Sequence, residues 1–184
     1  MPWKNVEQVE RRSYVCGYCG KDVGPDQAYY DSEARYRRIY ICPHCDRPTY
    51  YDGATQTPGA AYGNDVDDVP EDVNNLYGQA RLCMSVSSHT SAILTCRKIL
   101  MHIAVEKGAP VGKSFLDYVQ YLADNHYVPP DGSGWVDHIR KKGNEANHKI
   151  VIMGQEDAKN LIDFIEMLLK TIYEFPSRLP KDEE

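Results

Sequence analysis

The sequence has 184 residues, of which 42% are hydrophobic, which is enough for one packed domain and a small additional module. Its formal net charge of −6 argues against a protein that binds duplex nucleic acid indiscriminately, because such proteins carry a strongly basic face. No apolar run reaches the roughly 18 residues of a transmembrane helix, and the N-terminus lacks a signal-peptide hydrophobic segment. We therefore expect a soluble, cytoplasmic protein without a membrane partner.

Two C-x-x-C pairs lie near the N-terminus, Cys16 with Cys19 and Cys42 with Cys45, and residues 20–41 separate them. This spacing is typical of a zinc ribbon, in which two tight turns present four thiolates to one tetrahedral Zn²⁺. Four cysteine ligands leave no position for a water molecule, so the spacing predicts a structural rather than a catalytic zinc ion. A redox-active pair is the alternative, but no β-α-β pattern surrounds these cysteines.

Residues 28–30 and 36–41 are rich in tyrosine and isoleucine, which predicts two short strands that form a hairpin across the metal. Arginines that alternate with an aromatic ring suit phosphate binding and base stacking. The predicted nucleic-acid-binding residues are therefore Arg35, Tyr36, Arg37 and Arg38. The alternative is that the tyrosines form the small core of the module and the arginines lie solvated at its edge.

Charge and composition divide the chain. Residues 1–51 hold eight Lys/Arg and seven Asp/Glu, which leaves thirteen and twenty for the rest, or +1 against −7. A polyanionic partner would therefore bind the N-terminal module. Residues 52–69 are rich in glycine and acidic residues and have no period, as in a linker. We predict a zinc ribbon at 1–51, a linker at 52–69 and a helical domain at 70–180.

The helical domain begins with a proline and two carboxylates that suit a first helical turn: Pro70, Glu71 and Asp72. This helix should end near Ser85, and further helices are expected at about 90–107, 113–126, from 133 onward, and 156–174. In the second helix a core stripe follows the helical period: Ile93, Cys96, Leu100, Ile103 and Ala104. The predicted fold class is mainly α, a bundle of four to five helices with a small N-terminal β zinc ribbon.

A polar motif lies in the predicted fourth helix, where residues 139–148 read IRKKGNEANH. Arg140, Asn144 and His148 are four residues apart, so on a helix their polar groups share one face and could meet one ligand or partner subunit. The alternative is a solvated helix face on which His148 merely packs near a helix end.

The motif IR-x-x-GN-x-x-x-H, together with the apolar helix that follows it, resembles a bacterial domain-of-unknown-function family assigned to the HEPN superfamily. The resemblance covers about residues 70–180 and implies a HEPN-like helical bundle that pairs as a homodimer. Several members carry a zinc ribbon in front. Many catalytic HEPN domains are metal-independent ribonucleases with the motif Arg-Asn-x-x-x-His. Asn144 and His148 match it, whereas Gly143 occupies the position of the arginine.

Gly143 supplies no guanidinium for a phosphate, so the sequence favours a non-catalytic function. We expect a dimeric interaction or nucleic-acid-binding module with an RNA or protein partner. The resemblance implies a role in a prokaryotic or phage defence system. The alternative is a metal-independent endoribonuclease in which His148 is the general acid or base, Asn144 orients it, and Arg140 binds phosphate.

Overall fold

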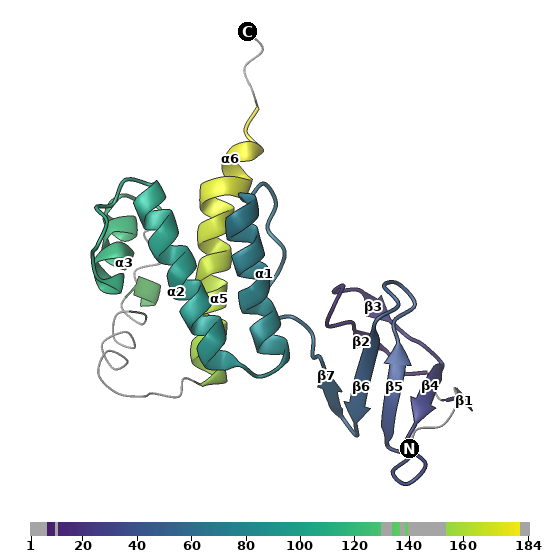
Figure 1. Ribbon diagram of the computed structural model, residues 1–184. Coiled ribbons are helices and arrows are strands. Elements are labelled where there is room, and N and C mark those ends of the chain that lie inside the picture. The colour runs from purple at the N-terminus through teal and green to yellow at the C-terminus, as the bar shows by residue number, and fades with distance from the viewer. Residues whose placement is uncertain (1–6, 10, 130–133, 137–138, 140–153, 181–184) are drawn as a thin grey trace. The chain divides into compact units, whose positions relative to one another are not determined.

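The computed structural model describes residues 7–9, 11–129, 134–136, 139 and 154–180. The chain divides into two compact units, which are drawn in Figure 1 and are described separately below. The N-terminal unit comprises residues 1–62 and 82–87, and the helical unit comprises residues 63–81 and 88–184. The predicted domain boundaries at 51, 69 and 180 stay a prediction.

The N-terminal unit contains two antiparallel sheets. The larger one has five strands in the order β1-β4-β5-β6-β7, and the smaller one pairs β2 with β3 (Figure 1). The strands of the larger sheet are β1 (Glu7–Gln8), β4 (Gln27–Tyr30), β5 (Arg37–Ile41), β6 (Pro48–Asp52) and β7 (Thr55–Thr57). The smaller sheet consists of β2 (Tyr14–Val15) and β3 (Asp22–Val23).

The prediction of a mainly α fold, with its HEPN-like bundle, is wrong, because the described chain combines helices with a sheet-rich N-terminal unit. The predicted hairpin exists as β4 and β5, with Tyr29 opposite Ile39. The sequence did not indicate that β6 and β7 extend it, and β7 lies inside the predicted linker. Strands of three to five residues contain too few alternations to show a period, and their pairing depends on distant residues.

One face of the larger sheet forms the core of the N-terminal unit. Tyr40 and Tyr51 lie on this face and are 1% and 3% exposed, and Tyr14 from β2 packs against both. The three ring centroids lie 5.5 to 6.2 Å apart in tilted and edge-on arrangements, which are favourable for aromatic pairs. Tyr40 therefore lies in a small core, as the alternative interpretation of the sequence expected, whereas Tyr29 and Tyr36 are 39% and 58% exposed.

Most of the predicted fourth helix lies outside the described residues, and the described helices of this unit agree with the sequence in their positions. They are α1 (Glu71–Ser85, of which residues 71–81 belong to this unit), α2 (His89–Glu106), α3 (Phe115–Asp124) and α5 (Gln155–Leu169). A π-helix at Lys170–Glu174 and a short helix α6 at Phe175–Ser177 follow. The last predicted helix, 156–174, thus changes its hydrogen-bonding pattern after Leu169. The described residues 134–136 are also helical.

Helix α2 packs against both α3 and α5, and its predicted core stripe is confirmed, since every member is at most 3% exposed. The facing side of α5 is equally buried, with Ile165 and Leu168 fully covered. At the start of α3, Ser114 and Asp117 form a reciprocal capping box. Among the described residues, no helix is long and apolar enough to cross a membrane.

Candidate metal centre

Two turns of the same design carry the four cysteines of the N-terminal unit. In the first turn the Gly20 N–H donates to the carbonyl of Cys16, and in the second the Asp46 N–H donates to that of Cys42, both at 2.9 Å. Gly20 and Asp46 have φ values of 66° and 56°, in the left-handed region that glycine and aspartate tolerate best. The two C-x-x-C segments therefore fold into matching knuckles.

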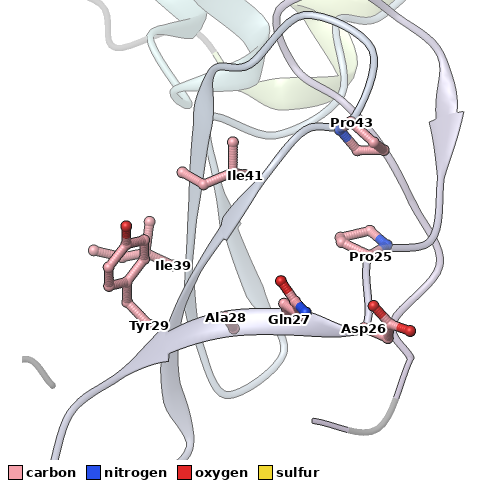
Figure 2. Close-up of a pocket in the computed structure, with 8 residues that line it drawn as sticks. All are labelled: Pro25, Asp26, Gln27, Ala28, Tyr29, Ile39, Ile41 and Pro43. Carbon is pink, nitrogen blue, oxygen red and sulfur yellow. The ribbon is translucent and has the colours of Figure 1, made fainter. Parts of the chain in front are cut away.

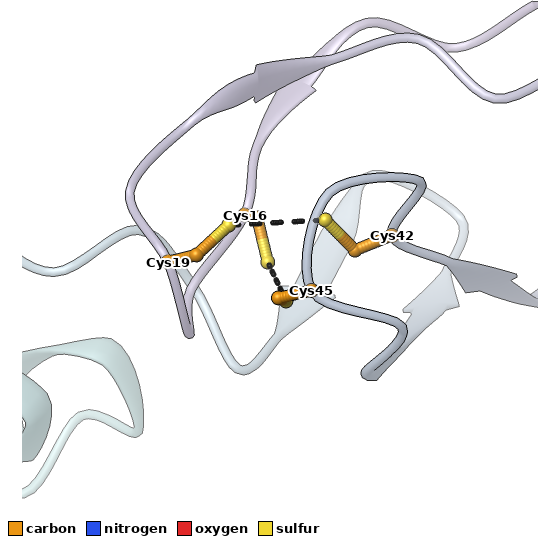
Figure 3. A group of neighbouring side chains, drawn as sticks. All are labelled: Cys16, Cys19, Cys42 and Cys45. Atoms are coloured by element: carbon orange, nitrogen blue, oxygen red, sulfur yellow. Dashed lines mark hydrogen bonds between the residues drawn. The ribbon is translucent and has the colours of Figure 1, made fainter.

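The knuckles bring all four sulfur atoms together (Figure 3). The Sγ atoms of Cys16 and Cys45 lie 3.8 Å apart, as do those of Cys19 and Cys42, and all four lie within 4.8 Å of one another. A tetrahedral ion with Zn–S bonds of about 2.3 Å requires sulfur atoms about 3.8 Å apart. The spacing of the sulfurs therefore fits a tetrahedral thiolate site, and these cysteines could hold a metal ion.

Backbone N–H groups point at the sulfur atoms. Burial would raise the pKa of Cys42, but the N–H groups of His44 and Cys45, together with neighbouring thiols, outweigh it and lower this pKa to about 7. The Arg47 N–H lowers the pKa of Cys45, but burial and the other three cysteines raise it to about 12. The thiols of Cys42 and Cys45 therefore differ in pKa, as expected where close thiolates repel one another.

The segment after β7 supports the first knuckle. A Cβ atom on Gly17 would lie only 2.3 Å from the carbonyl oxygen of Gly59, so this position accepts no side chain. Gln56 in β7 donates its amide to the carbonyls of Val15 and Pro58 at 2.8 and 3.0 Å, and it accepts from Tyr51 at 2.7 Å. Nothing in the sequence indicated that Gln56 and Gly59 support the site, because both lie in the predicted linker.

The predicted nucleic-acid-binding residues lie together at one end of β5, but two of the arginines are already paired. Arg35 donates to both carboxylate oxygens of Glu7 at 2.8 and 3.1 Å. Arg37 lies 3.7 Å from Asp31 and 3.6 Å from Asp52. Carboxylates therefore offset much of the positive charge of this region.

Of the other two predicted residues, Tyr36 is exposed and Arg38 is half-buried. Tyr36 is 58% exposed, and the guanidinium of Arg37 lies 5.6 Å from the centroid of its ring. Arg38 donates to the carbonyl of Arg35 and the hydroxyl of Tyr40, at 3.3 and 3.4 Å. Nucleic-acid binding at these four residues stays a prediction.

The predicted catalytic residues, Arg140, Asn144 and His148, lie outside the described residues, so their roles also stay a prediction. The helical unit nevertheless places two described side chains near this segment in sequence. Trp135 stacks on Phe164 of α5, with ring centroids 6.0 Å apart, and Ile139 is 6% exposed. Trp135 and the first residue of the motif, Ile139, are therefore packed within the helical unit.

Comparisons with known proteins identify the helical region alone. A family model described as "Domain of unknown function (DUF4145)" matches residues 78–183, which is more than half of the chain. The searches of curated proteins and of solved structures found no match. On the strength of the family match, the chain belongs to the DUF4145 family.

Proposed function

We propose that the N-terminal unit is a zinc ribbon in which Cys16, Cys19, Cys42 and Cys45 hold one structural Zn²⁺. The proposal rests on one observation, the two 3.8 Å sulfur–sulfur distances within a four-sulfur cluster. Soft thiolates in a tetrahedral arrangement select zinc over harder cations such as magnesium and calcium. Because all four positions are sulfur, no position is left for a substrate or a water molecule, and the ion cross-links the fold.

The metal-stabilised unit then serves as an interaction module, and we favour a protein partner over a nucleic acid. A polyanion needs unpaired cations, but Arg35 and Arg37 already face the carboxylates of Glu7, Asp31 and Asp52. A protein surface can use aromatic and apolar side chains instead. Exposed Tyr29 and Ile41 on the same sheet supply such groups.

The HEPN resemblance adds three finer proposals: a homodimer through the helical region, a role in a defence system, and a metal-independent ribonuclease as the second candidate function. The ribonuclease rests on the spacing of Arg140, Asn144 and His148 in the sequence. Its test is cleavage of mixed single-stranded RNA in chelator by the wild type and by His148→Ala. RNA cleavage by the wild type that is lost in stably folded His148→Ala would show that the protein is a ribonuclease. Absence of cleavage by the wild type would favour the non-catalytic interaction module.

The zinc ribbon is tested by metal content and by the absorption spectrum of the cobalt-substituted protein. We expect one zinc per chain and the intense visible and near-ultraviolet bands of tetrahedral thiolate-bound Co²⁺. Cys19→Ser should lose both, whereas Cys83→Ser should keep both, because Cys83 lies outside the cluster. Wild-type protein without bound metal, or metal retained at full affinity by Cys19→Ser, would overturn the proposal.

A further inference from the structure

The outer face of the larger sheet departs from the usual pattern of an antiparallel sheet. One face of such a sheet normally packs on the core while the other carries polar side chains. Here Tyr29, Ile39 and Tyr50 lie in one row across three strands on the outer face, and Ile41 lies beside them. Tyr29 and Ile41 are 39% and 38% exposed. An outward-facing apolar row of this kind is a candidate surface for binding a partner.

A groove opens beside this row where two strands separate (Figure 2). The pairing of β4 with β5 runs only from Tyr30 opposite Arg38 to Ala28 opposite Tyr40. Beyond Ala28 and Tyr40, the two backbone segments diverge toward Pro25 and Pro43. The groove between them has a volume of about 260 Å³. Its apolar lining comes from Pro25, Ala28, Tyr29, Ile39, Ile41 and Pro43. This volume is below the roughly 300–1,000 Å³ of small-molecule sites, so it suits a single bulky side chain.

The polar groups of the groove indicate which partner fits. Asp26 and Gln27 lie along one side, and Asp26 is the lining residue that carries a charge. No ion pair of Asp26 is found among the described residues. A carboxylate at the rim repels phosphate and attracts a cation. Nucleic acid is therefore the poorer candidate for this face, and an apolar side chain next to a basic residue is the better one.

We propose that this groove is a docking site for an extended peptide segment of a partner protein, which inserts one bulky aliphatic side chain between β4 and β5 and sets a lysine or arginine against Asp26. Ile39 and Ile41 contact the inserted side chain, and Gln27 offers its amide to the peptide backbone. This inference rests on the proposed interaction module and identifies the surface and the chemistry of the partner.

The test uses the full-length, zinc-loaded chain and three probe peptides: acetyl-Lys-Leu-Lys-amide, acetyl-Lys-Ala-Lys-amide and acetyl-Glu-Leu-Glu-amide. Isoleucine methyl signals are followed by NMR during each titration. We expect the first peptide to shift Ile39 and Ile41 with a roughly millimolar Kd, and the other two to bind at least fivefold more weakly. Equal shifts from all three peptides, or none from the first, would overturn the proposal, as would stronger shifts from a single-stranded oligonucleotide.

Two matched pairs of variants locate the site. Ile41→Ser should weaken binding of the first peptide about five- to tenfold, whereas Val15→Ser, at a similar exposure of 36%, should leave it unchanged. Asp26→Asn should weaken it about two- to fivefold, and Asp22→Asn, an exposed carboxylate outside the groove, should not. Zinc content is measured on every sample. Wild-type protein that holds zinc but does not bind the first peptide contradicts the groove alone, as does full binding by Ile41→Ser, whereas wild-type protein that holds no zinc contradicts the ribbon.

Discussion

The helical unit buries aliphatic side chains of α2, α3 and α5 against one another, whereas the N-terminal unit buries mainly tyrosines and cysteines. Its strands are at most five residues long, and Cys16 and Cys42 are themselves among its most buried residues. A module of this size buries little apolar surface and is at most marginally stable without a cross-link. The proposed metal ion would therefore stabilise the N-terminal unit, whose core is small, whereas the helical unit has a larger aliphatic core of its own.

The first prediction tests the core of the helical unit with two leucines of α2. Leu100 is fully buried and Leu94 is 61% exposed. Leu100→Ala should lower the free energy of unfolding of this unit by about 2–5 kcal/mol, because it leaves a cavity. Leu94→Ala should change it by less than about 0.5 kcal/mol. Urea unfolding followed by circular dichroism at 222 nm measures the free energy of unfolding of both variants. Equal effects of the two substitutions would contradict the described core.

A second, smaller effect is expected at Glu166 of α5, whose side chain is 12% exposed. It accepts from the backbone N–H and side-chain amide of Asn64, at 2.8 and 3.0 Å, and from Lys170 at 2.5 Å. Glu166→Gln should destabilise the helical unit by about 1–3 kcal/mol at pH 7. Glu156→Gln, at an exposed position of the same helix, is the control.

The pH dependence of this effect has a definite sign. Burial would raise the pKa of Glu166, but the hydrogen bonds from Lys170 and Asn64 outweigh it and hold this pKa below its usual range. The stabilisation is therefore fully present above the unfolded-state pKa of about 4.3 and is lost as the pH falls through the lower folded-state pKa. The difference between wild type and Glu166→Gln should shrink from pH 7 to pH 3. A difference that grows on acidification would contradict the assigned contacts.

The smallest effect is expected at the equivalent left-handed positions of the two knuckles. Gly20 has open space around it, so Gly20→Ala should cost only the backbone strain of about 1–2 kcal/mol. Asp46→Gly removes such strain and should not weaken the second knuckle. Competition with a zinc chelator should show about a tenfold loss of affinity for Gly20→Ala and no loss for Asp46→Gly. Equal losses of zinc affinity in Gly20→Ala and Asp46→Gly would contradict the assignment of equivalent left-handed positions to the two knuckles.

Features set by local sequence were predictable. The spacing of two C-x-x-C pairs identified the four cysteines that meet in the structure, because each knuckle closes within a few residues. The helical period identified the buried stripe from Ile93 to Ala104, since it repeats over several turns of one helix. The capped start of α3 and the ends of α1 and α2 also agree within a few residues.

Features set by distant contacts were not predictable. Gly59 and Gln56 support the first knuckle from what was predicted to be a linker, and nothing local to them indicates this contact. The π-helix places Glu174 in the interior, where its carboxylate accepts from the Asp67 N–H and from Arg178. A pattern search with the α-helical period of 3.6 residues does not predict the change to a π-helix after Leu169. The groove between β4 and β5 likewise depends on where their pairing ends.

The central claim, that a metal ion holds the N-terminal unit together while the helical unit folds without it, is tested most directly by hydrogen–deuterium exchange of the full-length protein before and after chelation. We predict that amides in β4, β5 and β6 lose their protection when the metal is removed, while those in α2 and α5 keep theirs. Unchanged exchange in the sheet, or simultaneous loss of protection in both units, would contradict it.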